Sequence, residues 1–397
     1  MSFAAKPLVA GDLFEASARL STEIDQEVAR LAEPAERIAV LRRRWDEIAA
    51  LGWPATVVPE EFGGAGGGLL DLAALVEGAG RAALPLPLAS VCGAVPALLG
   101  AAFVNAGEGG AALAREALTG VAEGRLRICP VLALATHGGA EGRADREGRP
   151  PLAARPGSGD DGAATLVLDG AVLGVEAPPE PTHYLLACPV HPAVGQEQSA
   201  ALVLLPADAP GLAARWHERI DGRPAVDLDL RSVPVPVGQV LARGEAVRER
   251  VASVSDAGAL LVCVEAVSAM GALLEQTIAY LSTRVQFGVP LASFQALRHR
   301  VAEMYVAYRS LRALVGRTLR RATEDGATAP PWREVALAKL RLGGVGRFMA
   351  EAAIQLHGGM GMTQELAAAR LAKRILMAEF EYGDTDHQAR RLLAAAR

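Results

Sequence analysis

Two short segments near the C-terminus carry residue types that suit the binding of a phosphate group. The first runs from Arg284 to Gln295 in the form R-x-x-F-G … F-Q, and the second runs from Gln355 to Gly361 in the form Q-x-x-G-G-x-G. A planar guanidinium binds phosphate through paired charge-assisted hydrogen bonds. Glycines let backbone N–H groups come close to an anion. The two segments therefore predict a site for a phosphate-bearing ligand.

The chain from Arg284 to Arg321 is locally cationic. Its only acid is Glu303, and its arginines are Arg284, Arg298, Arg300, Arg309, Arg312, Arg317, Arg320 and Arg321. The motif favours a binding role for Arg284. For the other arginines two interpretations stay open, namely a binding role and a solvated helix face that pairs with acids on a neighbouring subunit.

Three carboxylates in the C-terminal half of the chain stand out by their positions. Glu381 and Asp384 flank the pair Tyr382-Gly383, and Glu265 lies within an apolar helical stretch. Two of them have a structural interpretation, since Asp384 can cap a following helix and Glu265 can be a buried, paired carboxylate.

The histidines and cysteines predict no further chemistry. Nothing in the motifs fixes an acid or a thiol nucleophile against the imidazole of His357 or His387, so both are interpreted as hydrogen-bonding or packing residues. The seven histidines show no metal-ligand spacing. The four cysteines are far apart among apolar neighbours, which predicts buried thiols: Cys92, Cys129, Cys188 and Cys263.

The composition argues against several classes of protein. The 397 residues include 40 Lys and Arg against 45 Asp and Glu, a formal charge of −5, so the basic excess of a nucleic-acid binder is missing. The apolar stretch 260–270 is interrupted by Glu265, and no stretch reaches the roughly 18 apolar residues of a membrane span. Acids at Asp12 and Glu15 stand where a signal peptide needs its apolar core. We expect a cytoplasmic protein without nucleic-acid or membrane partners.

The order of elements around the two segments is helical, then β, then helical. Apolar residues recur at helical spacing from residue 12 to about 124, as in Leu20, Ile24 and Val28. Short runs rich in Val and Leu predict an antiparallel β domain: 126–136, 163–175, 184–189, 200–206 and 226–236. Residues 137–162 are predicted to be a mobile loop, and the glycine-rich run 63–68 a helix connector. The predicted domains are 1–124, 125–240 and 241–397.

The two motifs, together with the opening Leu51-Gly52-Trp53 … Pro59-Glu60-Glu61-Phe62-Gly63-Gly64, resemble the acyl-CoA dehydrogenase family over about residues 10–395. The likeness is strongest to bacterial members that end in Gly-Asp-x-Asp-His, such as the small subunit of two-subunit pimeloyl-CoA dehydrogenases. It implies a mostly α fold with a middle β domain and a C-terminal four-helix bundle. It further implies a dimer of dimers, acyl-CoA as substrate and electron-transfer flavoprotein as acceptor.

The resemblance implies FAD as the cofactor, shared across a dimer interface. The residues that match the family's cofactor-binding positions are Arg284, Gln286, Phe287, Gln295, Gln355, Leu356, Gly358, Gly359 and Thr385. In the family the matching positions of one subunit hold the ADP end of FAD that is bound mainly by the adjacent subunit. The flavin ring lies against the middle domain of its own subunit.

The family reaction is α,β-dehydrogenation of an acyl thioester, and the usual position of its base carries no carboxylate here. That position corresponds to Tyr382, and the position used by a minority of members corresponds to Gly258. A carboxylate can remove the weakly acidic α-proton when hydrogen bonds stabilise the resulting anion and water is excluded. Glu381 and Asp384 are the nearest catalytic candidates, and Glu265 is a further one. Because neighbouring helical residues point about 100° apart, Glu381 cannot replace the missing side chain without a local shift.

The middle domain also departs from the family pattern. Residues 135–142 read A-T-H-G-G-A-E-G in place of T/S-E-P-G-x-G-S-D, and residues 169–175 lack the Lys, Trp and Thr of the strand that flanks the flavin. Three hypotheses follow. The chain is an active homomeric enzyme with a displaced base, a supporting subunit that completes a partner's FAD site, or the same fold used as a flavin monooxygenase or cofactor-free binding module.

Overall fold

The structure is a computed structural model that describes residues 3–105, 107–134, 150–158, 164–191, 199–324 and 329–396. The chain divides into two compact units. The first unit contains Met1–Arg37, Leu69–Pro85 and Ala259–Arg397, and the second contains Ile38–Gly68 and Leu86–Gly258. The division into three domains at residues 124 and 240 stays a prediction.

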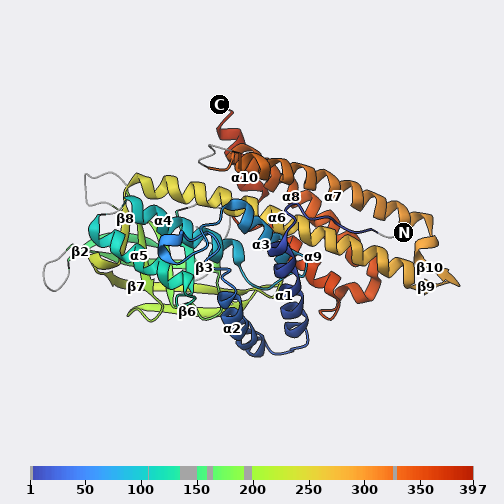
Figure 1. Cartoon of the computed structure of the whole chain (residues 1–397), viewed down its shortest axis with the longest axis horizontal. Coiled ribbons are helices and arrows are strands. Elements are labelled where there is room, and N and C mark those ends of the chain that lie inside the picture. The colour runs from blue at the N-terminus through green and yellow to red at the C-terminus, as the bar shows by residue number, and fades with distance from the viewer. Residues whose placement is uncertain are drawn as a thin grey trace. The chain divides into compact units, whose positions relative to one another are not determined.

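The first unit is built from helices, and the spacing of apolar residues explains which faces they bury. In the first helix the predicted stripe Leu20, Ile24 and Val28 is buried. Figure 1 shows the long C-terminal helices running side by side. The helices are α1 (Asp12–Val28), α3 (Leu69–Gly80), α6 (Glu245–Thr283, which begins in the second unit), α7 (Gln295–Ala322), α8 (Trp332–His357), α9 (Ala367–Ala378) and α10 (Thr385–Ala394).

Helix α6 contains a long apolar stretch. By length and composition alone it could cross a membrane, but 94% of its most apolar window is buried inside the protein. An all-round apolar helix is also what the core of a large protein requires.

The second unit contains helices and a sheet. Its helical segments are the greater part of α2 (Pro34–Ala50), the short turns η1 (Glu60–Phe62) and η2 (Ala89–Ala94), α4 (Val95–Asn105), α5 (Glu108–Ala122) and η4 (Val237–Gln239). The glycine-rich run after η1 is a connector, as predicted. The N–H groups of Gly64, Gly66 and Gly67 donate to backbone carbonyls of residues 56–59, so they serve the local turn.

Within the described residues the sheet has eight strands and is mixed rather than purely antiparallel. Seven strands follow the order β6-β7-β3-β2-β4-β5-β8, and β1 pairs with β4. The antiparallel prediction is wrong at β1–β4 and β2–β4, which are parallel. The strands are β1 (Ile128–Leu132), β2 (Ala153–Ser158), β3 (Ala164–Glu176), β4 (His183–Val190), β5 (Ser199–Pro206), β6 (Leu212–Glu218), β7 (Pro224–Val235) and β8 (Val240–Arg243).

The predicted loop 137–162 is wrong for the residues of β2. This strand pairs with β3 along its length and touches β4 at Ala154. It contains Pro156 and Gly157, so backbone pairing with its neighbours rather than an apolar pattern defines it. Residues 135–149 and 159–163 of the predicted strand and loop lie outside the described residues.

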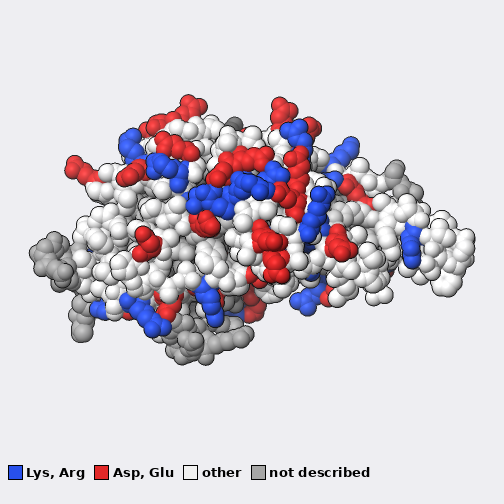
Figure 2. Space-filling model, turned by 90° about the horizontal axis from the view of Figure 1, so that it is seen from below, with Lys and Arg blue, Asp and Glu red and all other residues white. Residues whose placement is uncertain are grey.

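The buried core of the sheet consists mainly of Val, Leu and Ala side chains, together with Tyr184, Cys129 and Cys188. The cysteines belong to the protein core, as predicted. All four are free and buried. Burial raises the pKa of the Cys92, Cys188 and Cys263 thiols to about 12, so these thiols stay protonated near neutral pH. On the face of the molecule drawn in Figure 2, acidic and basic side chains are interspersed.

Candidate active site and cofactor site

The predicted Arg284 segment is a turn between two long helices. Helix α6 ends at Thr283, and the chain forms a short antiparallel hairpin, β9 (Val285–Gln286) and β10 (Val289–Pro290). Phe287 and Gly288 at its tip have φ of 54° and 81°, the left-handed conformation of a tight hairpin turn. The Leu291 N–H donates to the Arg284 carbonyl at 2.8 Å. After the turn η5 (Leu291–Ser293), α7 begins at Gln295.

A second contact brings the glycine motif to the same end of the first unit. The rings of Tyr280 and His357 stack with centroids 4.7 Å apart, and the Tyr280 hydroxyl lies 3.4 Å from the His357 carbonyl. Arg284 lies about one helical turn beyond Tyr280, and Gly358 follows His357 directly. The two motifs, separate in sequence, are therefore neighbours in the fold.

His357 has the structural role that the sequence predicts. Its Nδ1 lies 2.9 Å from the Ala353 carbonyl, and burial lowers the pKa of its imidazole. A neutral, hydrogen-bonded ring in contact with Tyr280 fixes the end of α8.

The polar side chains of this end point to solvent. Within the described residues none of the following makes a side-chain hydrogen bond or ion pair, and all are exposed: Arg284, Gln286, Gln295 and Gln355. We call these four residues, with Gly358 and Gly359, the exposed donor cluster.

The glycines beside these side chains leave room for a ligand. A Cβ placed on Gly358 or Gly359 would meet nothing within 4 Å, and Gly358 has a φ of +60° that favours glycine. Gly361 differs, because its Cβ would lie 2.5 Å from the Ile354 carbonyl oxygen. Gly361 therefore permits close packing of the turn η6 (Gly358–Met362), and the other two keep the surface open.

Three predicted cofactor residues have other surroundings. The Leu356 side chain is buried, whereas Phe287 is 90% exposed and its ring contacts Phe294 edge-on at 6.1 Å. Thr385 donates to the Glu379 carboxylate at 2.9 Å and lies against Gly343. Gly343 is about 20 Å along α8 from the glycine motif, so Thr385 is not part of the exposed donor cluster.

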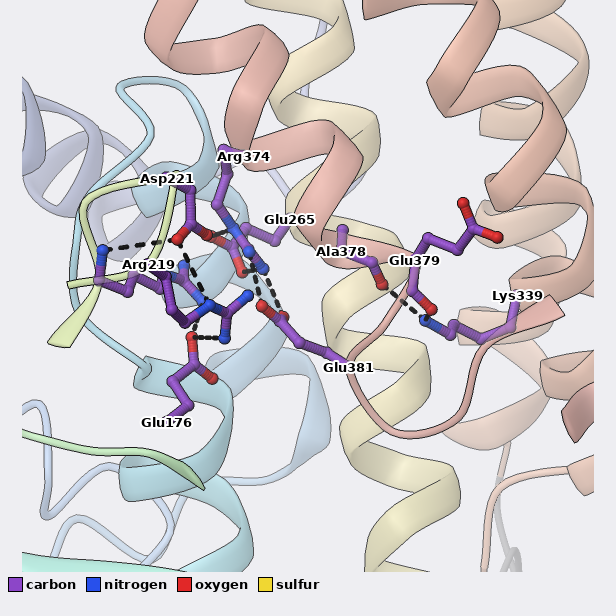
Figure 3. Close-up of polar contacts among 10 residues, drawn as sticks. Glu176, Arg219, Asp221, Glu265, Lys339, Arg374, Ala378, Glu379 and Glu381 are labelled. Carbon is purple, nitrogen blue, oxygen red and sulfur yellow. Dashed lines mark hydrogen bonds and ion pairs between the residues drawn. The ribbon is translucent and has the colours of Figure 1, made fainter. Parts of the chain in front are cut away.

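Two candidate bases, Glu381 and Asp384, lie in the turn between α9 and α10, and a buried lysine contacts the start of this turn. Lys339 on α8 is fully buried and donates to the carbonyls of Ala378 and Glu379 at 2.6 and 2.9 Å (Figure 3). These carbonyls belong to the C-terminal end of α9, where a cation is favoured. Burial lowers the pKa of Lys339 to about 8. The position of the turn is thus set from α8.

Glu381 is held in an ion cluster rather than presented as a free base. The Arg374 guanidinium donates to Glu381 at 2.6 and 2.5 Å and to Glu265 at 2.9 and 3.2 Å (Figure 3). All three side chains are at most 8% exposed. Glu265 is therefore the buried, paired carboxylate that its apolar surroundings indicate.

The sequence reasoning missed Arg374 and Lys339, although a signal was present. Arg374 lies at helical spacing from Leu371 and Ala378 on the buried face of α9, and Lys339 lies among the buried residues of α8. A charged residue on an apolar stripe predicts a buried partner.

Asp384 caps α10. Its Oδ1 accepts a hydrogen bond from the His387 N–H at 2.8 Å, the side-chain cap expected at this position. Tyr382, at the usual base position, has a φ of 53°, and the Gln388 side chain donates to its carbonyl at 3.0 Å. Gly258, the alternative base position, lies within α6. These geometries show what the side chains contact and leave the base assignment a prediction.

In the second unit, the strand expected beside a flavin ring ends at a carboxylate that binds two arginines. Glu176, the last residue of β3, accepts from Arg223 at 2.8 Å and pairs with Arg219 at 3.3 Å (Figure 3). The Asp221 carboxylate is fully buried and lies 3.4 Å from Arg219. The other departure from the family pattern, residues 135–142, falls outside the described residues.

The exposed donor cluster suits the diphosphate end of FAD. Arg284 offers a guanidinium without an internal partner, Gln295 and Gln355 offer amide groups, and Gly358 and Gly359 offer open backbone. A phosphate accepts bidentate hydrogen bonds from a guanidinium and further ones from amides and backbone N–H groups. The residues present therefore fit this part of the cofactor.

Comparison with protein families gives two matches along the chain. The model described as "Acyl-CoA dehydrogenase, N-terminal domain" matches residues 15–125, and "Acyl-CoA dehydrogenase, C-terminal domain" matches residues 248–396. The second match includes both motifs and the α9–α10 turn.

Individual proteins agree with these matches. The chain is 28% identical to acyl-CoA dehydrogenase IpdE2 of Mycolicibacterium smegmatis, over 87% of this chain and 84% of the relative. Butyryl-CoA dehydrogenase from Megasphaera elsdenii has the same fold, with a TM-score of 0.76 and 22% identity over the whole of both chains. A chain of the ChsE4-ChsE5 complex from Mycobacterium tuberculosis has a TM-score of 0.74 and 22% identity, over 98% of this chain and 99% of that one. The chain belongs to the acyl-CoA dehydrogenase family.

Proposed function

We propose that this chain is the supporting subunit of an FAD-dependent acyl-CoA dehydrogenase and completes the FAD site of a homologous catalytic chain. The reaction is the α,β-dehydrogenation of an acyl thioester. The observation that carries the proposal is a contrast. The exposed donor cluster is unpaired and open to solvent, whereas Glu381 and Asp384, the carboxylates nearest the usual base position, are engaged in structural contacts.

In this role the chain binds and orients the cofactor. Arg284 binds a phosphate of the FAD diphosphate, and Gln295 and Gln355 donate further hydrogen bonds. Gly358 and Gly359 let the backbone approach the ligand. FAD, when bound, accepts a hydride from the β-carbon of the substrate.

The proposal assigns the proton-abstracting carboxylate to the partner chain. Removal of a weakly acidic α-proton needs a carboxylate free to accept it. Glu381 and Glu265 are both bound by the Arg374 guanidinium, and a proton on either one would weaken a buried ion pair. The solved chain from the ChsE4-ChsE5 complex supports the idea that this fold occurs in complexes of two different chains. Electron-transfer flavoprotein is the proposed acceptor.

A second candidate function is supported by one feature of Asp384. Only its Oδ1 is used in the cap, and its Oδ2 accepts no hydrogen bond from the described residues. In that case the chain is a catalyst in its own right with Asp384 as a displaced base.

Flavin content and substrate reduction distinguish the two functions. The chain is purified alone and after co-expression with a homologous chain that carries a Glu at the usual base position. Flavin absorbance is read in each sample, and acyl-CoA is added without oxygen. We expect little flavin in the chain alone, and flavin that acyl-CoA bleaches in the complex. A chain that alone holds a full complement of bleachable flavin would refute the supporting role.

The role of Arg284 has a matched control. Arg284→Gln removes the guanidinium from the exposed donor cluster, and we expect the complex to lose flavin. Arg19→Gln changes another exposed arginine that has no partner within the described residues, and this variant should keep its flavin. Equal flavin content in the two variants would contradict the assignment of Arg284.

A further inference from the structure

Helices α7 and α8 form an antiparallel pair (Figure 1). Near the start of α7 the Arg300 guanidinium lies over the Phe348 ring of α8, 5.5 Å from its centroid. At the other end of the pair Arg321 forms an ion pair with Glu334. Because the start of one helix contacts the end of the other, their solvent-facing stripes lie next to each other.

These stripes carry many arginines. On α7 they lie opposite the buried residues Met304, Leu311 and Val315. We define the α7–α8 basic face by its exposed arginines, which are Arg298, Arg309, Arg317 and Arg320 on α7 and Arg333, Arg341 and Arg347 on α8.

Most of these charges have no acidic partner within the described residues. Arg347 lies 4.0 Å from Glu379, and none of the other six arginines makes an ion pair there. Arg309 donates to the Tyr305 hydroxyl, a neutral group. Since the whole protein has a formal charge of −5, this concentration of unpaired positive charge is local.

The face also contains apolar side chains that are exposed to solvent. Val306 is 66% exposed and Leu337 is 48% exposed. Two helices of this length, packed about 10 Å apart, offer a surface about 40 Å long and 20 Å wide. That is close to the roughly 800 Å² that each partner contributes to a stable protein interface. Apolar side chains among arginines suit a protein partner better than a phosphate backbone.

A second copy of the chain is a poor partner for this face. A two-fold symmetric contact places the same patch on both sides, so six unpaired arginines would meet six others. Juxtaposed like charges oppose association, and opposite charges favour it.

We infer that the α7–α8 basic face docks a non-identical chain whose facing helix pair is acidic, and that its charge prevents self-association through the same face. The inference rests on the proposed supporting role, and it adds that the charge of the α7–α8 basic face selects the partner. Arginine guanidinium groups pair with carboxylates bidentately, and Val306 and Leu337 lose their exposure to water.

A chain whose α7–α8 basic face carries reversed charges is complementary to the same face of the wild-type chain. The face variant carries Arg309, Arg317, Arg320 and Arg341 changed to Glu. Each change lowers the charge by two, so four changes take the formal charge from −5 to −13. Wild type, variant and their equimolar mixture are compared by sedimentation velocity at about 50 and 500 mM NaCl, because salt screens exposed charges.

A matched variant controls for net charge. It carries Arg19, Arg30, Arg243 and Arg250 changed to Glu, which are exposed arginines without ion pairs within the described residues, and it has the same charge of −13. We expect wild type to bind the face variant at least about tenfold more tightly than the control variant at low salt. We also expect a mixed species larger than either component, lost at high salt.

Two results would overturn the inference. One is a mixture that sediments as the sum of its components. The other is wild-type protein that self-associates at both salt concentrations and loses that association in the face variant but not in the control variant. Neither measurement depends on flavin or activity, so the proposed function is judged separately by the flavin content of the complex.

Discussion

Removal of the Arg374 side chain tests the ion cluster at the end of α9. In Arg374→Met, Glu265 and Glu381 lose the guanidinium that binds both at 2.5–3.2 Å in a region where the side chains are at most 8% exposed. Breaking a buried pair by removing one partner costs about 3–5 kcal/mol. For a unit of this size each kcal/mol lowers Tm by about 2–4 °C, so we expect a fall of roughly 10 °C.

Calorimetry of the variants measures this effect, and a triple variant is its control. Arg374→Met/Glu265→Leu/Glu381→Leu replaces all three side chains by apolar ones, and such a replacement of a buried ion triad is often neutral for stability. We expect it to recover most of the lost Tm. Arg374→Lys should be intermediate, because a lysine cannot bind two carboxylates bidentately. A single variant within 2 °C of wild type, or a triple variant as unstable as the single one, would refute the reasoning.

Three further predictions concern helices α8 to α10 and the turns between them. Asp384→Ala should lose about 1 kcal/mol through the missing cap whereas Asp384→Asn keeps it, and equal Tm values for the two variants would contradict the cap. The pKa of Lys339 is about 8 in the folded protein and about 10.4 in the unfolded chain. Between pH 8 and pH 10.4 the unfolded state therefore binds more protons than the folded state. The free energy of unfolding is therefore measured against pH for wild type and for Lys339→Met. The wild-type value minus the variant value should be flat below pH 8 and rise by up to about 3 kcal/mol toward pH 10.4, and parallel pH profiles would exclude this shift. Gly361→Ala should cost about 1–3 kcal/mol because its Cβ meets a carbonyl oxygen at 2.5 Å, while Gly359→Ala should stay within about 0.5 kcal/mol; equal unfolding midpoints would contradict the close packing.

Periodicity predicted much of the fold because burial repeats with the backbone. The buried strands β3, β5 and β7 followed from runs of Val and Leu. Strand β6 was missed because it lies at the edge of the sheet and five of its seven residues are exposed, so the sequence shows no apolar run. The parallel pairing of β1 with β4 was also missed, since a run of apolar residues has no information on strand direction.

At the candidate site, the sequence predicted contacts between residues that are close together in the chain. The Asp384 cap, for example, depends on residues only three positions apart. The partner of Glu265 could not be predicted, because Arg374 lies 109 residues further along the chain. Only the packing of α9 against α6 brings the two together, and periodicity within one helix does not specify which charged residue of another helix it meets.

The Arg374 cluster also restricts how related sequences can diverge. Loss of the arginine alone takes the guanidinium from two buried carboxylates, and loss of either acid takes a carboxylate from the buried guanidinium, so each single step is disfavoured. Related sequences should therefore either keep Glu265, Arg374 and Glu381 together or replace all three. A carboxylate at position 382 would stand next to Glu381 in the sequence. A base gained at that position would therefore lie close to a guanidinium that already binds two acids.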